Sequence, residues 1–163
     1  MQNRECGSCT ACCEGWIGSE VIDMGIDKPC QHCTAQGCAI YESRPVDPCQ
    51  VFKCAWLKED SPLPDDMRPD KSLAIVILDQ KWRGHRIISA APTGAKIPQE
   101  TLDWLTAYSQ EIRRPLIFME NLYRDGKYRG WKKTGFGPPS FVELVKSTIG
   151  VNDLIRFKGG ASG

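Results

Sequence analysis

The segment Cys6-Gly-Ser-Cys9-Thr-Ala-Cys12-Cys13 begins a run of nine cysteines, all of them within the first 54 residues of a 163-residue chain. A two-residue gap between cysteines lets both thiolates of the turn face one metal ion about 2.3 Å away. Small residues in that gap ease the tight turn. The later cysteines are also closely spaced, so we treat all nine as candidate metal ligands: Cys6, Cys9, Cys12, Cys13, Cys30, Cys33, Cys38, Cys49 and Cys54.

Cys12 and Cys13 are adjacent, and the side chains of neighbouring residues tend to point in different directions. Such a pair suits two neighbouring metal ions better than one tetrahedral site, so we expect a multinuclear site. Three zinc ions need twelve ligand positions, which nine cysteines supply if three of them bridge two metals. Alternatively, eight cysteines complete two separate four-cysteine sites.

Spacing alone does not choose between zinc and iron. The pattern CxxCxxC also begins the [4Fe-4S] sites of bacterial ferredoxins, where a fourth cysteine follows after three residues and precedes a proline. Here the next cysteine is Cys13 and Glu14 follows it, which weakens that analogy. The expected cofactors are therefore zinc ions or iron, the iron being either simple ions or an iron-sulfur cluster such as [4Fe-4S].

The N-terminal residues and the lengths of the apolar stretches indicate a protein of a reducing compartment. The N-terminal residues are polar and lack the basic and apolar regions of a secretory signal. No apolar stretch approaches the roughly 18 residues needed to cross a bilayer. In a reducing cytoplasm, closely spaced cysteines are metal ligands more often than disulfides, and an odd number would leave one thiol unpaired. We therefore expect a cytoplasmic protein without membrane partners.

Composition divides the chain into two lobes, residues 1–61 and 62–163. Every cysteine lies in the first lobe, and a proline- and aspartate-rich connector follows it. Residues 1–70 carry six Lys and Arg against twelve Asp and Glu, whereas residues 71–163 carry fifteen against eight, so the halves should attract each other. The expected fold class is α+β, with a small irregular cysteine-rich lobe packed on a lobe of β-hairpins and two short helices.

Alternating and helical patterns predict the elements of the second lobe. The β-rich segments 73–78 and 86–91 form one expected hairpin, and segments 116–123 and 127–132 form another around Asp125-Gly126, a favoured turn dipeptide. Pro98 opens an expected helix that ends before Pro115 and carries an apolar stripe. A shorter helix should follow Pro138-Pro139, with Ser140 and Glu143 forming a capping box.

Several other residues of the first lobe are candidates for supporting a metal site. Arg44 can donate hydrogen bonds to thiolates or carbonyls and offset their negative charge. Tyr41 and Trp56 are expected to cover the site. His32 lies beside two cysteines, but an exposed loop position is the more common outcome for such a histidine.

The stretch from Arg113 to Lys133 holds seven Lys and Arg against two acidic residues, interleaved with Tyr123, Tyr128 and Trp131. That combination is able to bind nucleic acid. It is also the ordinary pattern of a solvated hairpin face with cross-strand pairs, which we favour.

The first lobe resembles a bacterial cysteine-cluster family described as a zinc- or iron-chelating domain with the motif CxxCxxCC. The resemblance covers residues 5–57 and implies chelation by eight cysteines. A related motif occurs in bacterial flagellin lysine methylases, where it is associated with an iron-sulfur cluster. This chain departs from the pattern at Cys33, a position that is usually apolar in the family, so either a ninth ligand or a free thiol fits it. The resemblance rests on Cys6, Cys9, Cys12, Cys13, Cys30, the string Cys38-Ala-Ile-Tyr41-Glu-Ser-Arg44-Pro45, Cys49, Phe52, Cys54 and Trp56.

These features favour a metal-binding protein that stores, delivers or senses zinc or iron, with metal ions and a protein as its partners. No phosphate-cradling loop, dinucleotide fingerprint or catalytic triad motif occurs, so non-enzymatic metal binding is the first hypothesis and enzyme activity stays open. The alternatives are an iron-sulfur redox enzyme or accessory to protein or peptide modification, and a nucleic-acid-binding protein with a structural metal.

Overall fold

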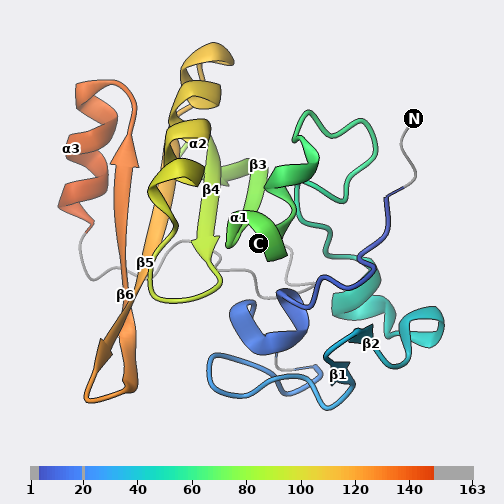
Figure 1. The fold of residues 1–163 in the computed structure, drawn as a ribbon. Helices are drawn as coiled ribbons and strands as arrows, with labels where there is room; N and C mark the ends of the chain where they lie inside the picture. Colours follow the sequence, from blue (N-terminus) through green and yellow to red (C-terminus); the bar gives the residue numbers. More distant parts are fainter. Residues whose placement is uncertain (1–3, 20, 149–163) are drawn as a thin grey trace.

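The computed structural model describes residues 4–19 and 21–148. Short turns and two-residue strands occupy the region before residue 74, and longer strands and helices follow. Figure 1 shows this first region, before residue 74 and coloured blue to green, gathered at the β3 side of the sheet. The α+β class expected from the sequence is confirmed.

A four-stranded sheet with the order β3-β4-β5-β6 forms the centre of the second region. Both outer pairs are antiparallel hairpins, as expected, whereas the central strands β4 and β5 run parallel. In the second hairpin, the turn residues Asp125 and Gly126 have φ values of 54° and 74°, as a tight hairpin turn requires. The strands are β3 (Ala74–Trp82), β4 (His85–Pro92), β5 (Leu116–Arg124) and β6 (Lys127–Phe136).

Helix α2 (Gln99–Glu111) connects β4 to β5, since parallel neighbours need a crossover connection. Pro98 occupies its N-cap position, as the sequence predicts. Leu105 is fully buried, and Leu102, Tyr108 and Ile112 pack against the core beside it. The apolar stripe expected on this helix is therefore confirmed.

Helix α3 (Pro139–Ser147) forms where expected, but the prediction of a capping box at its start was wrong. Pro138 takes the N-cap position and no side chain caps the helix. Pro139 suits the first helical position because its φ is already helical and the missing N–H needs no partner there. Ser140 consequently lies inside the first turn. Within the described part of the chain, no helix has the length and apolar composition needed to span a bilayer.

The cysteine-rich region is built from short pieces joined by turns. Their irregularity follows from a sequence that has closely spaced cysteines, glycines and prolines in place of apolar periodicity. The pieces are the helical turn η1 (Cys12–Trp16), the strands β1 (Cys33–Thr34) and β2 (Gly37–Cys38), the turns η2 (Tyr41–Ser43), η3 (Val46–Gln50) and η4 (Asp65–Met67), and the short helix α1 (Pro69–Ser72).

One cluster of buried side chains runs from the cysteine-rich region into the sheet. Ala55 and Trp56 belong to it together with Ile75 and Ile88 from the strands. The Ala55 amide also donates a hydrogen bond to the carbonyl oxygen of Val76 in β3, at 2.7 Å. The two regions thus share a core, and the boundary at residue 61 stays a prediction from composition.

A second cluster covers the face of the sheet opposite part of that core. Phe141 and Val145 of α3 pack against Ile87, Ile117 and Trp82. Neighbouring strand residues such as Ile88 and Leu116 join the main cluster instead. Successive side chains of a strand point to opposite faces, so the central strands are buried on both sides.

Candidate metal centre

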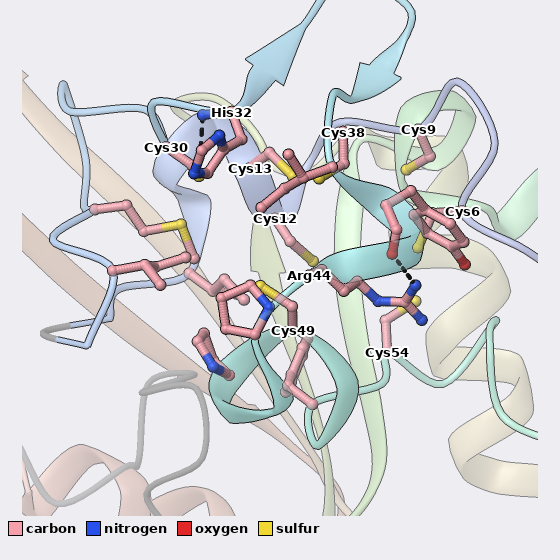
Figure 2. A pocket seen from close by; sticks show the side chains of 18 of the residues that line it. Cys6, Cys9, Cys12, Cys13, Cys30, His32, Cys38, Arg44, Cys49 and Cys54 are labelled. Atoms are coloured by element: carbon pink, nitrogen blue, oxygen red, sulfur yellow. Dashed lines mark hydrogen bonds between the residues drawn. The ribbon is translucent and has the colours of Figure 1, made fainter.

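Eight of the nine cysteines line one cavity of about 240 Å³ in the first region. All nine are free thiols in the structure. In the view of Figure 2, Cys30 lies on the left, Cys6 and Cys54 lie on the right, and Cys12 and Cys13 lie between them. Residues separated by almost fifty positions are thus brought to one site. The lining cysteines are Cys6, Cys9, Cys12, Cys13, Cys30, Cys38, Cys49 and Cys54.

Electrostatic interactions divide these thiols into two adjoining groups. Cys12 interacts with Cys54, Cys6 and Cys9, and Cys54 in turn interacts with Cys6 and Cys9. We call these four residues the first thiol group.

The second thiol group consists of Cys13, Cys30, Cys38 and Cys49. Cys13 interacts with the other three, and Cys49 interacts with Cys30 and Cys38. Cys33, which does not line the cavity, acts on Cys13 more strongly than any of them. The groups adjoin through the adjacent pair Cys12 and Cys13 and through interactions of Cys6 with Cys38 and Cys49. Among the eight thiols that line the cavity, this arrangement fits the alternative of two four-cysteine sites, and the interactions of Cys33 with Cys13, Cys30 and Cys38 leave the nine-cysteine alternative open.

Burial and mutual repulsion raise the pKa of several of these thiols, which favours the protonated form in the absence of metal. Burial, followed by repulsion from Cys33 and Cys38, raises the pKa of Cys13 to about 12. Burial likewise raises the pKa of Cys54 to about 11, and that of Cys12 well above its usual value. A metal ion must therefore displace thiol protons when it binds.

Backbone amides donate hydrogen bonds to sulfur in both groups. In the first group, Cys9 accepts from the Ala11 amide, and Cys54 accepts from the Leu57 and Trp56 amides. In the second group, Cys30 accepts from the His32 amide at 3.4 Å. The bonds to Cys9 and Cys54 lower the pKa of those thiols, so the backbone opposes the effect of burial there.

Two turns of the CxxC type position the ends of this site. The Cys9 amide donates to the Cys6 carbonyl oxygen at 2.9 Å, and the Cys33 amide donates to the Cys30 carbonyl oxygen at 3.0 Å. The Cys30 amide also donates to the Cys13 carbonyl oxygen at 2.7 Å, which ties the second turn to η1.

Glycine permits the close packing of these segments. Gly37 in β2 has a φ of 126°, and a Cβ added there would lie 2.5 Å from the carbonyl oxygen of Gly7. Gly15 in η1 has a φ of 95°, and a Cβ there would lie 1.9 Å from the carbonyl oxygen of Gly25. A side chain at either position would separate the backbones that carry the thiols.

Arg44 lies against the cavity, as the sequence analysis anticipated (Figure 2). Its guanidinium donates a hydrogen bond to the Tyr41 carbonyl oxygen at 2.6 Å and stacks 3.9 Å from the centre of the Tyr41 ring. Its charge lowers the pKa of Cys6 and Cys49 against the larger effect of burial. Tyr41 also shares a hydrogen bond with the Cys6 thiol. Arg44 thus places positive charge beside both groups.

Trp56 lines the cavity and contacts two arginines that the sequence analysis missed. The guanidinium carbons of Arg4 and Arg68 lie 4.7 Å and 5.8 Å from the centre of its ring. Arg4 also donates hydrogen bonds to the Trp56 and Leu63 carbonyl oxygens. The contacts of Arg4 join positions 52 and 59 residues apart, which no local pattern indicates.

The indole N–H of Trp56 is buried and has no hydrogen-bond acceptor among the residues that the structure describes. A buried donor without an acceptor is costly. A thiolate or sulfide in the cavity is the kind of acceptor that such a donor suits. The donor set of the cavity is therefore chemically compatible with a thiolate-bound metal.

Cys33 and His32 occupy different positions relative to the cavity. His32 is a lining residue, whereas Cys33 is not. Cys33 nevertheless shares a hydrogen bond with the Cys13 thiol and is paired across β1 and β2 with Cys38. It therefore lies beside the second thiol group and outside the cavity.

The thiols surround the cavity without converging on single points. Within residues 4–19 and 21–148, no group of three or more His, Cys, Asp or Glu side chains is close enough to hold a metal ion. Binding by either group would therefore require inward movement of the sulfur atoms. The cavity offers room for that movement.

The basic hairpin of β5 and β6 has partners for its charged and aromatic side chains. Tyr123 packs edge-to-face on Tyr128, with ring centres 5.9 Å apart. Lys132 pairs with Glu120 at 3.2 Å, and the Lys133 ammonium lies 5.3 Å from the centre of the Trp82 ring. These pairs fit the interpretation as a solvated face, and nucleic-acid binding stays a prediction.

Comparison with protein-family models, curated proteins and solved structures finds no match to this chain.

Proposed function

We propose that this protein binds zinc or iron through the two thiol groups and acts in metal handling or metal sensing. The observation that carries the proposal is the convergence of eight cysteines on one cavity in two sets of four. Four thiolates complete a tetrahedral site and leave no open position of the kind that catalytic zinc keeps. Binding and release of metal, and not catalysis, is the activity that such closed sites favour.

The surroundings of the thiols support the proposal independently of their number. Two zinc ions with four thiolates each carry a net charge of about −4, which needs compensation in a partly buried site. Arg44 lies beside both groups, and Arg68 lowers the pKa of Cys9 against the effect of burial. The amide donors to sulfur and the indole N–H of Trp56 act in the same direction. The resemblance to the zinc- or iron-chelating family belongs to this proposal, as does a reducing compartment such as the cytoplasm.

An iron-sulfur protein that transfers electrons, or that assists modification of a protein or peptide, is the second candidate. The size and lining of the cavity favour it. Bare zinc ions drawn into thiolate tetrahedra need little added volume, whereas about 240 Å³ bounded in part by Ile17, Met24 and Phe52 suits a bulkier group in an apolar shell. Apolar surroundings are one of the means by which a protein sets the potential of such a cluster.

Purification without oxygen, followed by measurement of zinc, iron and acid-labile sulfide per chain, tests the proposal. We expect two zinc ions or two iron centres per chain. Replacement of Cys12 with Ser should remove metal from the first group, and replacement of Cys13 with Ser should remove it from the second. Gln36→Ala, at the exposed tip of the small hairpin, is the matched control and should keep full occupancy.

The outcomes separate the candidates. A colourless zinc protein contradicts the redox function, and a brown protein with sulfide contradicts the zinc site. A wild-type chain that is folded and carries no metal after reconstitution with either ion contradicts the whole proposal.

A further inference from the structure

Cys33 is held beside the second thiol group by a small hairpin. It lies directly opposite Cys38 in the pairing of β1 and β2, and the Ala39 amide donates to the His32 carbonyl oxygen at 2.8 Å next to that pair. Side chains of directly opposite residues share a face and lie within contact range. The hydrogen bond between the thiols of Cys33 and Cys13 places a second member of the group within reach.

An acidic residue that does not line the cavity lies near Cys33. The exposed carboxylate of Glu14 acts electrostatically on the Cys33 thiol. Thr10 fixes that carboxylate by donating a hydrogen bond at 3.0 Å. A carboxylate beside an accessible thiol raises the local concentration of cations at that point of the surface.

A metal ion enclosed by four thiolates exchanges slowly if one bond must break before another forms. Zinc accepts a fifth ligand transiently, so a spare thiol next to a bound one offers a faster route by substitution. Cys33 meets this requirement because it contacts Cys13 and is not needed to complete either group of four.

We propose that Cys33 is the exchange ligand of the second thiol group, through which a metal ion enters and leaves that group. The inference rests on the proposed metal binding and assigns Cys33 a kinetic role within it. On release, a bond forms between the Cys33 sulfur and the metal while the bond between the Cys13 sulfur and the metal breaks. The proton from Cys33 passes to Cys13 along their shared hydrogen bond, and no electron is transferred. An external thiol or chelator then displaces Cys33 and, in turn, Cys30, Cys38 and Cys49, and each freed thiolate takes up a proton from solvent.

Transfer of zinc from the loaded full-length protein to a chromophoric chelator tests this role. We expect two kinetic phases in the wild type, one for each group. Cys33→Ser should slow one phase by about tenfold, a change that corresponds to a barrier higher by about 1.4 kcal/mol. The number of zinc ions bound and their affinity at equilibrium should be unchanged. Ala35→Ser, in the same hairpin, is the matched control and should exchange at the wild-type rate.

A second variant separates the role of Cys33 from an effect on folding. Glu14→Gln keeps every thiol and should slow the same phase by a smaller factor, because it removes only the attraction for the cation. Unchanged rates in Cys33→Ser overturn the inference, and so does the loss of one zinc ion, since Cys33 would then be a permanent ligand. A wild-type chain that binds no zinc overturns the proposed function itself, and this is seen before any rate is measured.

Discussion

At the scale of single residues, the site depends on places where two backbones touch. Gly37 is the clearest, because the hairpin that carries Cys33 and Cys38 rests on the carbonyl oxygen of Gly7, between the first two cysteines. Contact at that distance leaves no volume for a methyl group. The same residue also has a φ that other residues rarely adopt.

Replacement of Gly37 with Ala should lower the free energy of unfolding at a fixed zinc concentration. The added Cβ meets a backbone oxygen at 2.5 Å, which a flexible side chain cannot relieve. We expect a loss of about 2 kcal/mol beyond that of the control, within the range of substitutions that introduce strain or overpacking. The control is Gly130→Ala, where φ is 116° and open space surrounds the new Cβ.

Chemical denaturation of both variants measures this difference. Equal losses in the two variants would show that backbone strain alone matters and that the contact with Gly7 does not.

At the scale of elements, helix α3 packs closely on strand β6 because the strand has a glycine, Gly135, at the point of contact. A Cβ added at Gly135 would lie 2.7 Å from Cγ2 of Val145, which is itself buried in the second cluster. The backbone of Gly135 does not have a positive φ, so space and not conformation requires glycine there. The helix consequently packs close to the strand.

Gly135→Ala should destabilise the protein by about 1 to 3 kcal/mol, the usual cost of overpacking. Val145→Ala should also destabilise it, because it leaves a cavity. The double variant should lose less than the sum of the two, since the shortened side chain makes room for the new methyl group. A double-mutant cycle by thermal or urea unfolding measures the coupling, and additive losses would contradict this packing.

Elements with a strong local pattern could be predicted from the sequence. The apolar alternation around Asp125-Gly126 predicted the second hairpin, and the stripe beginning at Leu102 predicted helix α2. Both predictions succeeded because each pattern lies within a single hairpin or helix. The expected capping box at Ser140 did not give the helix start, because Pro138 is the N-cap and the helix begins at Pro139, two residues earlier than a cap at Ser140 would place it. The parallel pairing of β4 with β5 depends on contacts across α2, which no local pattern contains.

For the candidate site, too, local patterns were predictable from the sequence and contacts between distant positions were not. The spacing of the cysteines predicted which residues gather, and eight of them line one cavity. It did not predict how they divide, because the separation of Cys12 from Cys13 depends on the path of the whole segment. The placement of Arg4 on Trp56 could not be predicted from a local pattern either, since it joins positions 52 residues apart.

At the scale of the whole molecule, the cysteine-rich region and the sheet are joined by a shared core. We therefore expect the loss of metal to affect residues far from the thiols. Treatment of the metal-loaded protein with a strong chelator should accelerate amide hydrogen exchange in β3 and β4 as well as around the cavity. The loaded protein should also unfold in a single thermal transition.

Hydrogen exchange with and without chelator measures this coupling. The double variant Cys12→Ser with Cys13→Ser is the control, and the chelator should change its exchange little because both groups are incomplete. Unchanged protection of β3 and β4 in the wild type, or two separate thermal transitions, would show that the regions are independent.

The first thiol group also has a topological consequence. Cys6 and Cys54 belong to the same group although nearly the whole cysteine-rich segment lies between them. A metal held by both would close that segment into a ring of 49 residues. For a covalent cross-link of this length, the loss of disorder in the unfolded chain stabilises the folded one by about 4 kcal/mol. One ion would thus act as a cross-link between the two ends of the segment. The segment would then be stabilised by this closure of the chain as much as by packing of its side chains.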